Sequence, residues 1–138
     1  MQSLQTCGPH RYSIEQDVVY WQMVDVMEES HLEVLLASVD SVLAHFHHSI
    51  LLVDCAQAHS LSVEARRRYA TWLKNNPYPN RASVFYAASG EMRAFLLLAQ
   101  RGAELLSGKR SAIEIFDDEA SARAHAAELR NSWVQPPA

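Results

Sequence analysis

Two apolar segments constrain the fold of this chain more than any other feature: residues 49–55, with an unbroken apolar run at 50–53, and residues 82–88, with Val84, Phe85 and Tyr86. Strands that are covered on both faces have this composition, and such strands are typical of parallel sheets. Amphipathic segments, whose apolar residues recur at helical spacing, lie before, between and after them. This alternation of buried strands with one-sided helices predicts an α/β fold with right-handed crossovers and a mainly parallel sheet.

The remaining elements follow from the same patterns. Residues 11–15 and 18–24 predict an opening hairpin whose first strand is an antiparallel edge, and residues 112–116 predict a last strand. Residues 56–61 are expected to form a loop. The order of elements is therefore β-β-α-β-α-β-α-β-α, with about five strands and four helices. The expected N-caps are Ser30, with Glu33 completing a capping box, and Ser62, Ser89 and Asp117.

The composition is that of one ordinary globular domain. The chain has 138 residues, of which 49% are apolar and 20% are charged, and this length supports one core of useful size. We expect a single domain over residues 10–132, with flexible segments at residues 1–9 and 133–138. Trp21 and Trp72 are expected in the core. The inward face of the last helix is expected to contain Ala120, Ala124, Ala127 and Leu129.

Charge and hydropathy exclude several classes of function. Twelve Lys and Arg against sixteen Asp and Glu give a net charge of −4, which lacks the basic excess of a nucleic-acid binder. No apolar stretch approaches the roughly 18 residues of a membrane span, and no signal peptide is visible. Cys7 and Cys55 form no C-x-x-C motif and are expected to be reduced thiols in the cytoplasm. Neither a metal site nor a cofactor is predicted.

Three short segments carry a family resemblance. ILLVD at residues 50–54 leads into a helix with Tyr69, VFYAA at 84–88 leads into a leucine-rich helix, and FDDEA at 116–120 opens the last one. In this order the segments resemble the STAS domain family and, more narrowly, its SpoIIAA-like branch, which is related in fold to the CRAL-TRIO lipid-binding domains. The resemblance covers about residues 11–130 and implies a β-α superhelix with a mixed sheet.

The resemblance also implies a mode of action. Typical STAS members act by protein contact: they bind an anti-sigma kinase and are phosphorylated on a Ser at the start of the second helix. Aligning Asp54 with the Asp that ends the family's strand places Ser62 on the Asp of the D-S-S-G-L-like motif and Val63 on the phosphorylated Ser. Glu64 and Ala65 then replace the remaining Ser and Gly. The regulatory motif is therefore absent here, while the implied fold is unaffected.

The segment after the second long strand is the predicted functional surface. In open parallel sheets, clefts form outside the carboxyl ends of the strands. The residues expected there, for interaction or phosphorylation, are Asp54, His59, Ser60, Ser62 and Ser89. Displaced phosphorylation at Ser60 or Ser62 is one interpretation, and a purely structural role in caps and turns is the other.

Two sets of residues have a chemical interpretation beside a structural one. Asp54, His59 and Ser60 have the side chains of a hydrolytic triad, but residues this close in one loop rarely reach its geometry. The three histidines within residues 45–48 have metal-binding side chains, but their spacing does not converge on a helix, and a solvated helix end is favoured. We expect neither catalysis nor metal binding.

The third helix is apolar on most of its sides. Beyond its inward stripe, which contains Phe95, it carries Leu97, Leu98 and Leu105. Such a helix is buried in the core, lies in a dimer contact, or borders a groove for an apolar ligand. Phe95 and the three leucines are therefore a candidate dimer or ligand face.

Together these patterns predict a cytoplasmic, STAS-like regulatory or protein-interaction module that is not an enzyme. Its partner is expected to be another protein or a second copy of the chain, with an apolar ligand also open; no nucleic acid and no integral membrane segment are expected. The alternative is a binder or carrier of an apolar small molecule or lipid, and an enzyme ranks third.

Overall fold

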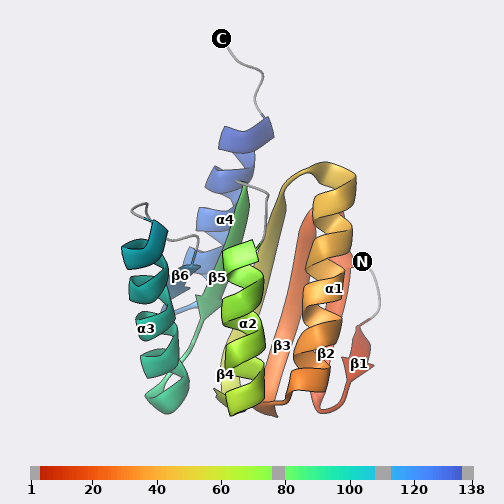
Figure 1. Ribbon diagram of the computed structural model, residues 1–138. Helices are drawn as coiled ribbons and strands as arrows, with labels where there is room; N and C mark the ends of the chain where they lie inside the picture. Colours follow the sequence, from red (N-terminus) through yellow and green to blue (C-terminus); the bar gives the residue numbers. More distant parts are fainter. Residues whose placement is uncertain (1–3, 76–79, 108–112, 135–138) are drawn as a thin grey trace.

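The computed structural model describes residues 4–75, 80–107 and 113–134. Within these residues the chain forms four helices and six strands (Figure 1). In chain order they are β1 (Gln5–Cys7), β2 (His10–Glu15), β3 (Val18–Met27), α1 (Glu29–Phe46), β4 (Ser49–Leu61), α2 (Val63–Asn75), β5 (Arg81–Tyr86), α3 (Gly90–Ser107), β6 (Ile113–Phe116) and α4 (Glu119–Val134).

The strands form one sheet in which chain order is also spatial order. β1, β2 and β3 pair in antiparallel fashion, whereas β3, β4, β5 and β6 are parallel. The two apolar segments that dominate the sequence are the adjacent interior strands β4 and β5, with Ser49 opposite Arg81 and Asp54 opposite Tyr86. The mixed, mainly parallel sheet with four helices is therefore confirmed, with one strand more than expected.

The additional strand, β1, lies in the segment that the sequence predicts to be flexible, and that prediction is wrong for Gln5–Cys7. β1 is an edge strand that pairs with β2 alone, with Cys7 opposite His10. Gly8 lies in the turn between them with a φ of 58°, which glycine adopts without strain. Because β1 has no alternating apolar pattern, backbone pairing defines it and the sequence pattern does not.

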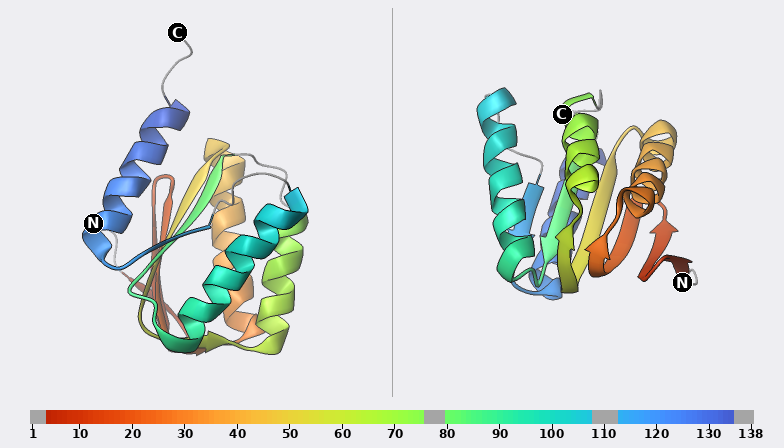
Figure 2. Two further views of the ribbon diagram at one scale, coloured as in Figure 1. Left: turned by 90° about the vertical axis from the view of Figure 1, so that its left-hand side faces the viewer. Right: turned by 60° about the horizontal axis from the view of Figure 1, so that its bottom comes forward.

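The helices cover the two faces of the sheet unequally. α1, α2 and α3 lie on one face and α4 on the other (Figure 2), because right-handed crossovers between successive parallel strands place every connecting helix on the same side. The larger core lies beneath α1–α3, where Trp21 and Trp72 are buried as predicted. The smaller core lies beneath α4, around Leu52, Val84 and Ala122. Within the described residues, no helix combines the length and apolar character that crossing a membrane requires.

Helix α1 begins earlier than the sequence predicts. Its N-cap is Glu28 rather than Ser30, and a capping box joins Glu28 to His31 instead of Ser30 to Glu33. The His31 Nδ1 accepts a hydrogen bond from the Glu28 N–H at 3.2 Å. This start follows from β3, which runs to Met27 and leaves a single residue between strand and helix.

Helix α4 differs from its prediction in its cap and in its buried face. The cap is Asp118 rather than Asp117, because the Asp118 Oδ1 accepts a hydrogen bond from the Ser121 N–H at 2.7 Å. The residues turned toward the sheet are Ala122, Ala126, Leu129 and Trp133, whereas Ala120, Ala124 and Ala127 are exposed. Alanines lie on every side of this helix, so the spacing of its larger residues identifies the inner face. The helix also continues into the second segment predicted to be flexible.

Candidate functional site

The carboxyl ends of the parallel strands lie along one edge of the sheet, at the bottom of Figure 1. β3, β4, β5 and β6 are each followed there by the start of a helix. Clefts of open parallel sheets form at such edges, where the free N–H groups of helix starts attract anionic groups. The predicted polar residues all come to this edge, from β4, α2 and the start of α3.

Residues 56–61 form a strand instead of the predicted loop. β4 continues to Leu61 and pairs in parallel with β3, which is also long and ends at Met27. Two register shifts interrupt this pairing. β5 ends opposite Asp54, so the extension of β4 has a strand on one side only. A strand in this position needs no continuous apolar sequence, and that is why its polar composition was misleading.

Asp54 lies where β4 leaves the central sheet, opposite Gln22 on β3 and Tyr86 on β5. Its Oδ1 accepts a hydrogen bond from the Ala56 N–H at 2.9 Å. Burial and the neighbouring Tyr20 raise the pKa of the Tyr86 hydroxyl, and the charge of Asp54 adds to this effect. The two tyrosine hydroxyls lie 3.5 Å apart. Asp54 therefore fixes the backbone, and Tyr86 stays protonated.

The other predicted polar residues have distinct environments. His59 is exposed, and its Nε2 lies 3.4 Å from the Glu91 Oε2 in the first turn of α3. The Ser62 Oγ accepts a hydrogen bond from the Ala65 N–H at 3.1 Å and caps α2, as predicted. Ser89 is exposed and directly precedes α3. The ends of β4 and the starts of α2 and α3 thus form one continuous polar edge.

The three residues of the suggested hydrolytic triad are not brought together. In the described part of the chain, no hydrogen bond joins Asp54, His59 and Ser60 to one another, and the carboxylate partner of His59 is Glu91. Ser60 is buried, with 8% of its surface exposed. Burial also raises the pKa of the neighbouring Cys55 thiol to about 12, so this cysteine is not a nucleophile at neutral pH.

The three histidines near the end of α1 do not converge on a common site. His45 lies in the last helical turn, and His47 ends the helix in the left-handed conformation with a φ of 64°. The His48 Nε2 lies 3.0 Å from the Asp17 Oδ2. Among the residues that the structure describes, no three His, Cys, Asp or Glu side chains are grouped as metal ligands.

Helix α3 exposes the leucines that extend beyond its inward stripe. Leu98 and Leu105 are 72% and 80% exposed, and Leu97 is 46% exposed. Phe95 is half-buried, and the Arg66 guanidinium lies 5.2 Å from the centre of its ring. The sheet covers α3 on one side only, so the three leucines are not core residues. We call Leu97, Leu98 and Leu105 the leucine face.

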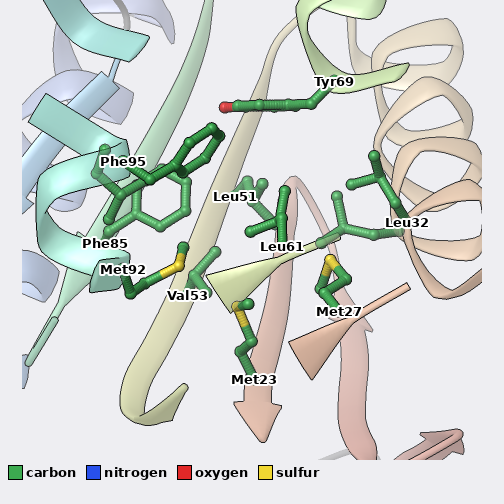
Figure 3. A pocket seen from close by; sticks show the side chains of 12 residues that line it. Met23, Met27, Leu32, Leu51, Val53, Leu61, Tyr69, Phe85, Met92 and Phe95 are labelled. Carbon is green, nitrogen blue, oxygen red and sulfur yellow. The ribbon is translucent and has the colours of Figure 1, made fainter. Parts of the chain in front are cut away.

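The structure also contains an apolar cavity that the sequence patterns do not predict (Figure 3). It has a volume of about 30 Å³ and lies between the sheet and helices α1–α3. Its lining includes Met23 and Met27 from β3, Tyr69 from α2, and Met92 and Phe95 from α3. Only tertiary packing brings these residues together, since they are spread over most of the chain.

No protein-family model matches this sequence, and no curated protein matches it. Solved structures do match. A Thermotoga maritima protein, described as a candidate anti-sigma factor antagonist, has a TM-score of 0.57 at 14% identity, and the match covers 86% of this chain and 92% of that one. An uncharacterised protein of the DUF3478 family from Shewanella loihica, described as having a SpoIIAA-like fold, has a TM-score of 0.56 at 16% identity, covering 88% and 98%.

A third match is the anti-sigma factor antagonist SpoIIAA in its unphosphorylated form, with a TM-score of 0.54 at 6% identity, covering 91% of this chain and 96% of that one. At these identities the similarity establishes architecture and not activity. It agrees with the SpoIIAA-like resemblance carried by residues 11–130. The chain therefore has the SpoIIAA-like fold of STAS domains.

Proposed function

We propose that this chain is a non-catalytic regulatory module that acts in the cytoplasm by binding another protein. The observation that carries the proposal is the leucine face, in which Leu98 and Leu105 are more than two-thirds exposed. Large apolar side chains grouped on the surface of a folded domain mark contacts with other molecules. The printed descriptions of two structural neighbours as anti-sigma factor antagonists support a regulatory role. A second copy of this chain is the other partner that fits the leucine face.

The polar edge favours regulation over catalysis. A kinase needs an exposed hydroxyl group, and Ser89 is exposed. The Oγ of Ser62 is engaged in the helix cap, and Ser60 is buried, so Ser89 is favoured over both. Val63 occupies the position that the STAS resemblance assigns to the phosphorylated Ser. Phosphopeptide mapping of the protein from its native host tests this assignment: phosphate at Ser89 supports it, and its absence under several growth states removes it.

A lipid carrier is the second candidate and is less well supported. Pockets for drug-sized ligands have volumes of about 300–1,000 Å³, whereas the cavity beneath α2 has about 30 Å³. A lipid would therefore need to separate α2 from α3 or lie on the leucine face. Lipid extraction and mass spectrometry of the purified protein distinguish this function from protein binding.

The test of the proposed function replaces Leu98 and Leu105 by serine. Both side chains are exposed, so we expect the fold and stability to be retained. Crosslinking and affinity purification from the native host should recover a defined partner with the unmodified protein and lose it with the double variant. Leu4→Ser is the matched control, because Leu4 is 46% exposed and precedes β1, outside the leucine face.

Light scattering of the same proteins tests whether the partner is a second copy, since a dimer should dissociate in the double variant. Retention of the partner by the Leu98→Ser, Leu105→Ser protein contradicts the assignment of the leucine face. Recovery of a stoichiometric lipid without any protein partner contradicts the interaction function itself.

A further inference from the structure

Two exposed arginines accompany the leucine face. Arg101 follows Leu98 by three residues and precedes Leu105 by four, so the three side chains share the outer side of α3. Arg67 is exposed on the neighbouring helix α2. Among the described residues, neither guanidinium has a carboxylate partner at ion-pair distance. Both arginines therefore present a positive charge that the domain itself does not neutralise.

Helix α2 places its basic side next to α3. The two helices lie side by side over the sheet (Figures 1 and 2), and the Arg66 guanidinium lies 5.2 Å from the centre of the Phe95 ring. The single carboxylate of α2 belongs to Glu64, one turn before Arg68, and Arg68 forms an ion pair with α1. Glu64 therefore lies on the side of α1, whereas Arg66 lies on the side of α3 and Arg67 on the outer side.

This basic side contrasts with the charge of the whole chain. The net charge is −4, whereas α2 carries four cationic side chains and one carboxylate. A local excess of positive charge beside an apolar surface favours an acidic partner. The negative charge of the whole chain disfavours the other anionic surface that cells offer, a membrane of acidic lipids.

The spacing of the leucines fits a helical partner. Leu98 and Leu105 lie seven residues apart on α3, which is about 10.5 Å at the helical rise of 1.5 Å per residue. Apolar side chains that recur every two turns of a second helix have the same spacing, whereas those on one face of a strand recur about every 6.6 Å. The leucine face therefore matches the apolar stripe of an amphipathic helix.

Gly102 leaves room for a partner beside these leucines. It follows Leu98 by four residues and precedes Leu105 by three. Its φ is not positive, and no atom lies within 4 Å of the place that a Cβ would occupy. Neither the backbone nor the packing of the domain thus requires glycine here, although glycine weakens a helix interior. A side chain of a docked helix can approach the α3 backbone at this point.

We propose that the leucine face binds an acidic amphipathic helix of another protein. The apolar stripe of that helix packs against Leu98 and Leu105, one of its side chains lies over Gly102, and its carboxylates lie beside Arg67 and Arg101. The inference rests on the proposed function and names the chemistry of the partner.

The test uses two synthetic peptides of about 20 residues, a length that supports a helix. Both carry the same leucine stripe at helical spacing, and the positions beside the stripe are Glu in one peptide and Lys in the other. Fluorescence anisotropy with the full chain should show saturable binding of the acidic peptide that weakens as sodium chloride is added. The basic peptide should bind about tenfold more weakly.

Charge variants test the role of the two arginines. Arg67→Glu and Arg101→Glu should each weaken the binding of the acidic peptide roughly fivefold, because an exposed ion pair is replaced by repulsion. Arg11→Glu is the matched control, since Arg11 is exposed on β2, away from α2 and α3, and the change in net charge is the same. Circular dichroism checks that the variants keep their helices.

The leucine variants separate this inference from the proposed function. The Leu98→Ser, Leu105→Ser protein should lose the acidic peptide. If that loss occurs but the two peptides bind the unmodified protein equally, the acidic partner is wrong and the leucine face stands. If the double variant binds as before, the leucine face itself is wrong. Absence of saturable binding of the acidic peptide overturns the inference, and cosedimentation of the protein with phosphatidylglycerol vesicles would then assign the surface to a membrane.

Discussion

At the scale of single residues, His10 shows how a buried imidazole joins the opening hairpin to α1. It is fully buried, and its Nδ1 accepts a hydrogen bond from the Val24 N–H at 3.0 Å. Its Nε2 lies 3.3 Å from the His31 Nδ1, which also accepts from the Glu28 N–H. Since Nδ1 of His10 is an acceptor, the proton of the neutral ring belongs on Nε2 and points to His31. A second proton on the His10 ring would be on Nδ1, where it would face the Val24 N–H and displace the hydrogen bond that Nδ1 accepts.

This geometry predicts a loss of stability in mild acid. Burial and the neighbouring His31 lower the pKa of His10 from 6.5 to about 4. Between those values the unfolded chain binds a proton that the folded chain does not, so stability is complete above pH 6.5 and falls as the pH falls toward 4. The slope from this residue is at most about 1.4 kcal/mol per pH unit. Urea unfolding at several pH values in this interval measures it.

The matched variants for this prediction are His10→Gln and His59→Gln. His10→Gln removes the titrating group and should flatten the pH dependence, even if it lowers stability at neutral pH. The His59 side chain is 65% exposed, so His59→Gln should keep the dependence of the unmodified protein. An unchanged slope in His10→Gln would show that another group causes the acid sensitivity.

At the scale of the elements, Ser62 tests how α2 is started. Its Oγ accepts the Ala65 N–H, and loss of such a cap typically costs about 1 kcal/mol. We expect Ser62→Ala to lower the free energy of unfolding by about that amount. Ser62→Asp should match the unmodified protein, because Asp caps equally well and its charge suits a helix N-terminus. Ser41→Ala, on the exposed side of α1, is the control in the same urea experiment. Equal destabilisation by Ala and Asp at position 62 contradicts the capping role.

The elements that could be predicted are those in which an apolar run or a regular apolar spacing reflects burial in the core. Residues 49–55 and 82–88 are apolar because helices cover both of their faces, and they lie side by side in parallel as expected. β1 and the end of β4 could not be predicted, since backbone pairing with one neighbouring strand holds them and their polar side chains carry no pattern. The caps of α1 and α4 were displaced by one or two residues, because several adjacent side chains are competent to cap.

The candidate site was predicted in position but not in its contacts. Parallel topology alone brings Asp54, Ser62 and Ser89 to one edge, and the sequence is sufficient for that inference. The partner of His59 on α3 and the gathering of Tyr69 and three methionines around one cavity depend on how helices pack over the sheet. Such contacts join residues far apart in the chain, and periodicity within one element does not encode them.

At the scale of the whole molecule, an ion pair fastens α4 over the second face of the sheet. Asp17, in the turn between β2 and β3, has a side chain that is 7% exposed. Its two oxygens accept hydrogen bonds from the Arg130 Nη2 at 2.7 Å and Nε at 3.0 Å, and the His48 Nε2 lies 3.0 Å from Oδ2. Burial alone would raise the pKa of Asp17, but these hydrogen bonds outweigh it and lower the pKa below 3.8. The hairpin, the end of α1 and α4 thus meet at one carboxylate.

Asp17→Asn should therefore lower the free energy of unfolding of the whole domain. The amide keeps the shape of the side chain but lacks the negative charge that pairs with Arg130. Hydrogen bonds to charged groups contribute about 1.5–3 kcal/mol each. We expect the free energy of unfolding to fall by roughly 2 kcal/mol at neutral pH, because the Arg130 side chain is 40% exposed and regains hydration. In the unmodified protein this stabilisation is present above pH 3.8 and is lost as the pH falls through the lowered pKa, whereas Asp17→Asn lacks that loss. Asp117→Asn is the control, since the Asp117 carboxylate is 92% exposed and lies 3.7 Å from Arg93, a contact worth less than about 1 kcal/mol. Equal urea midpoints for the two variants would mean that apolar packing alone holds α4 in place.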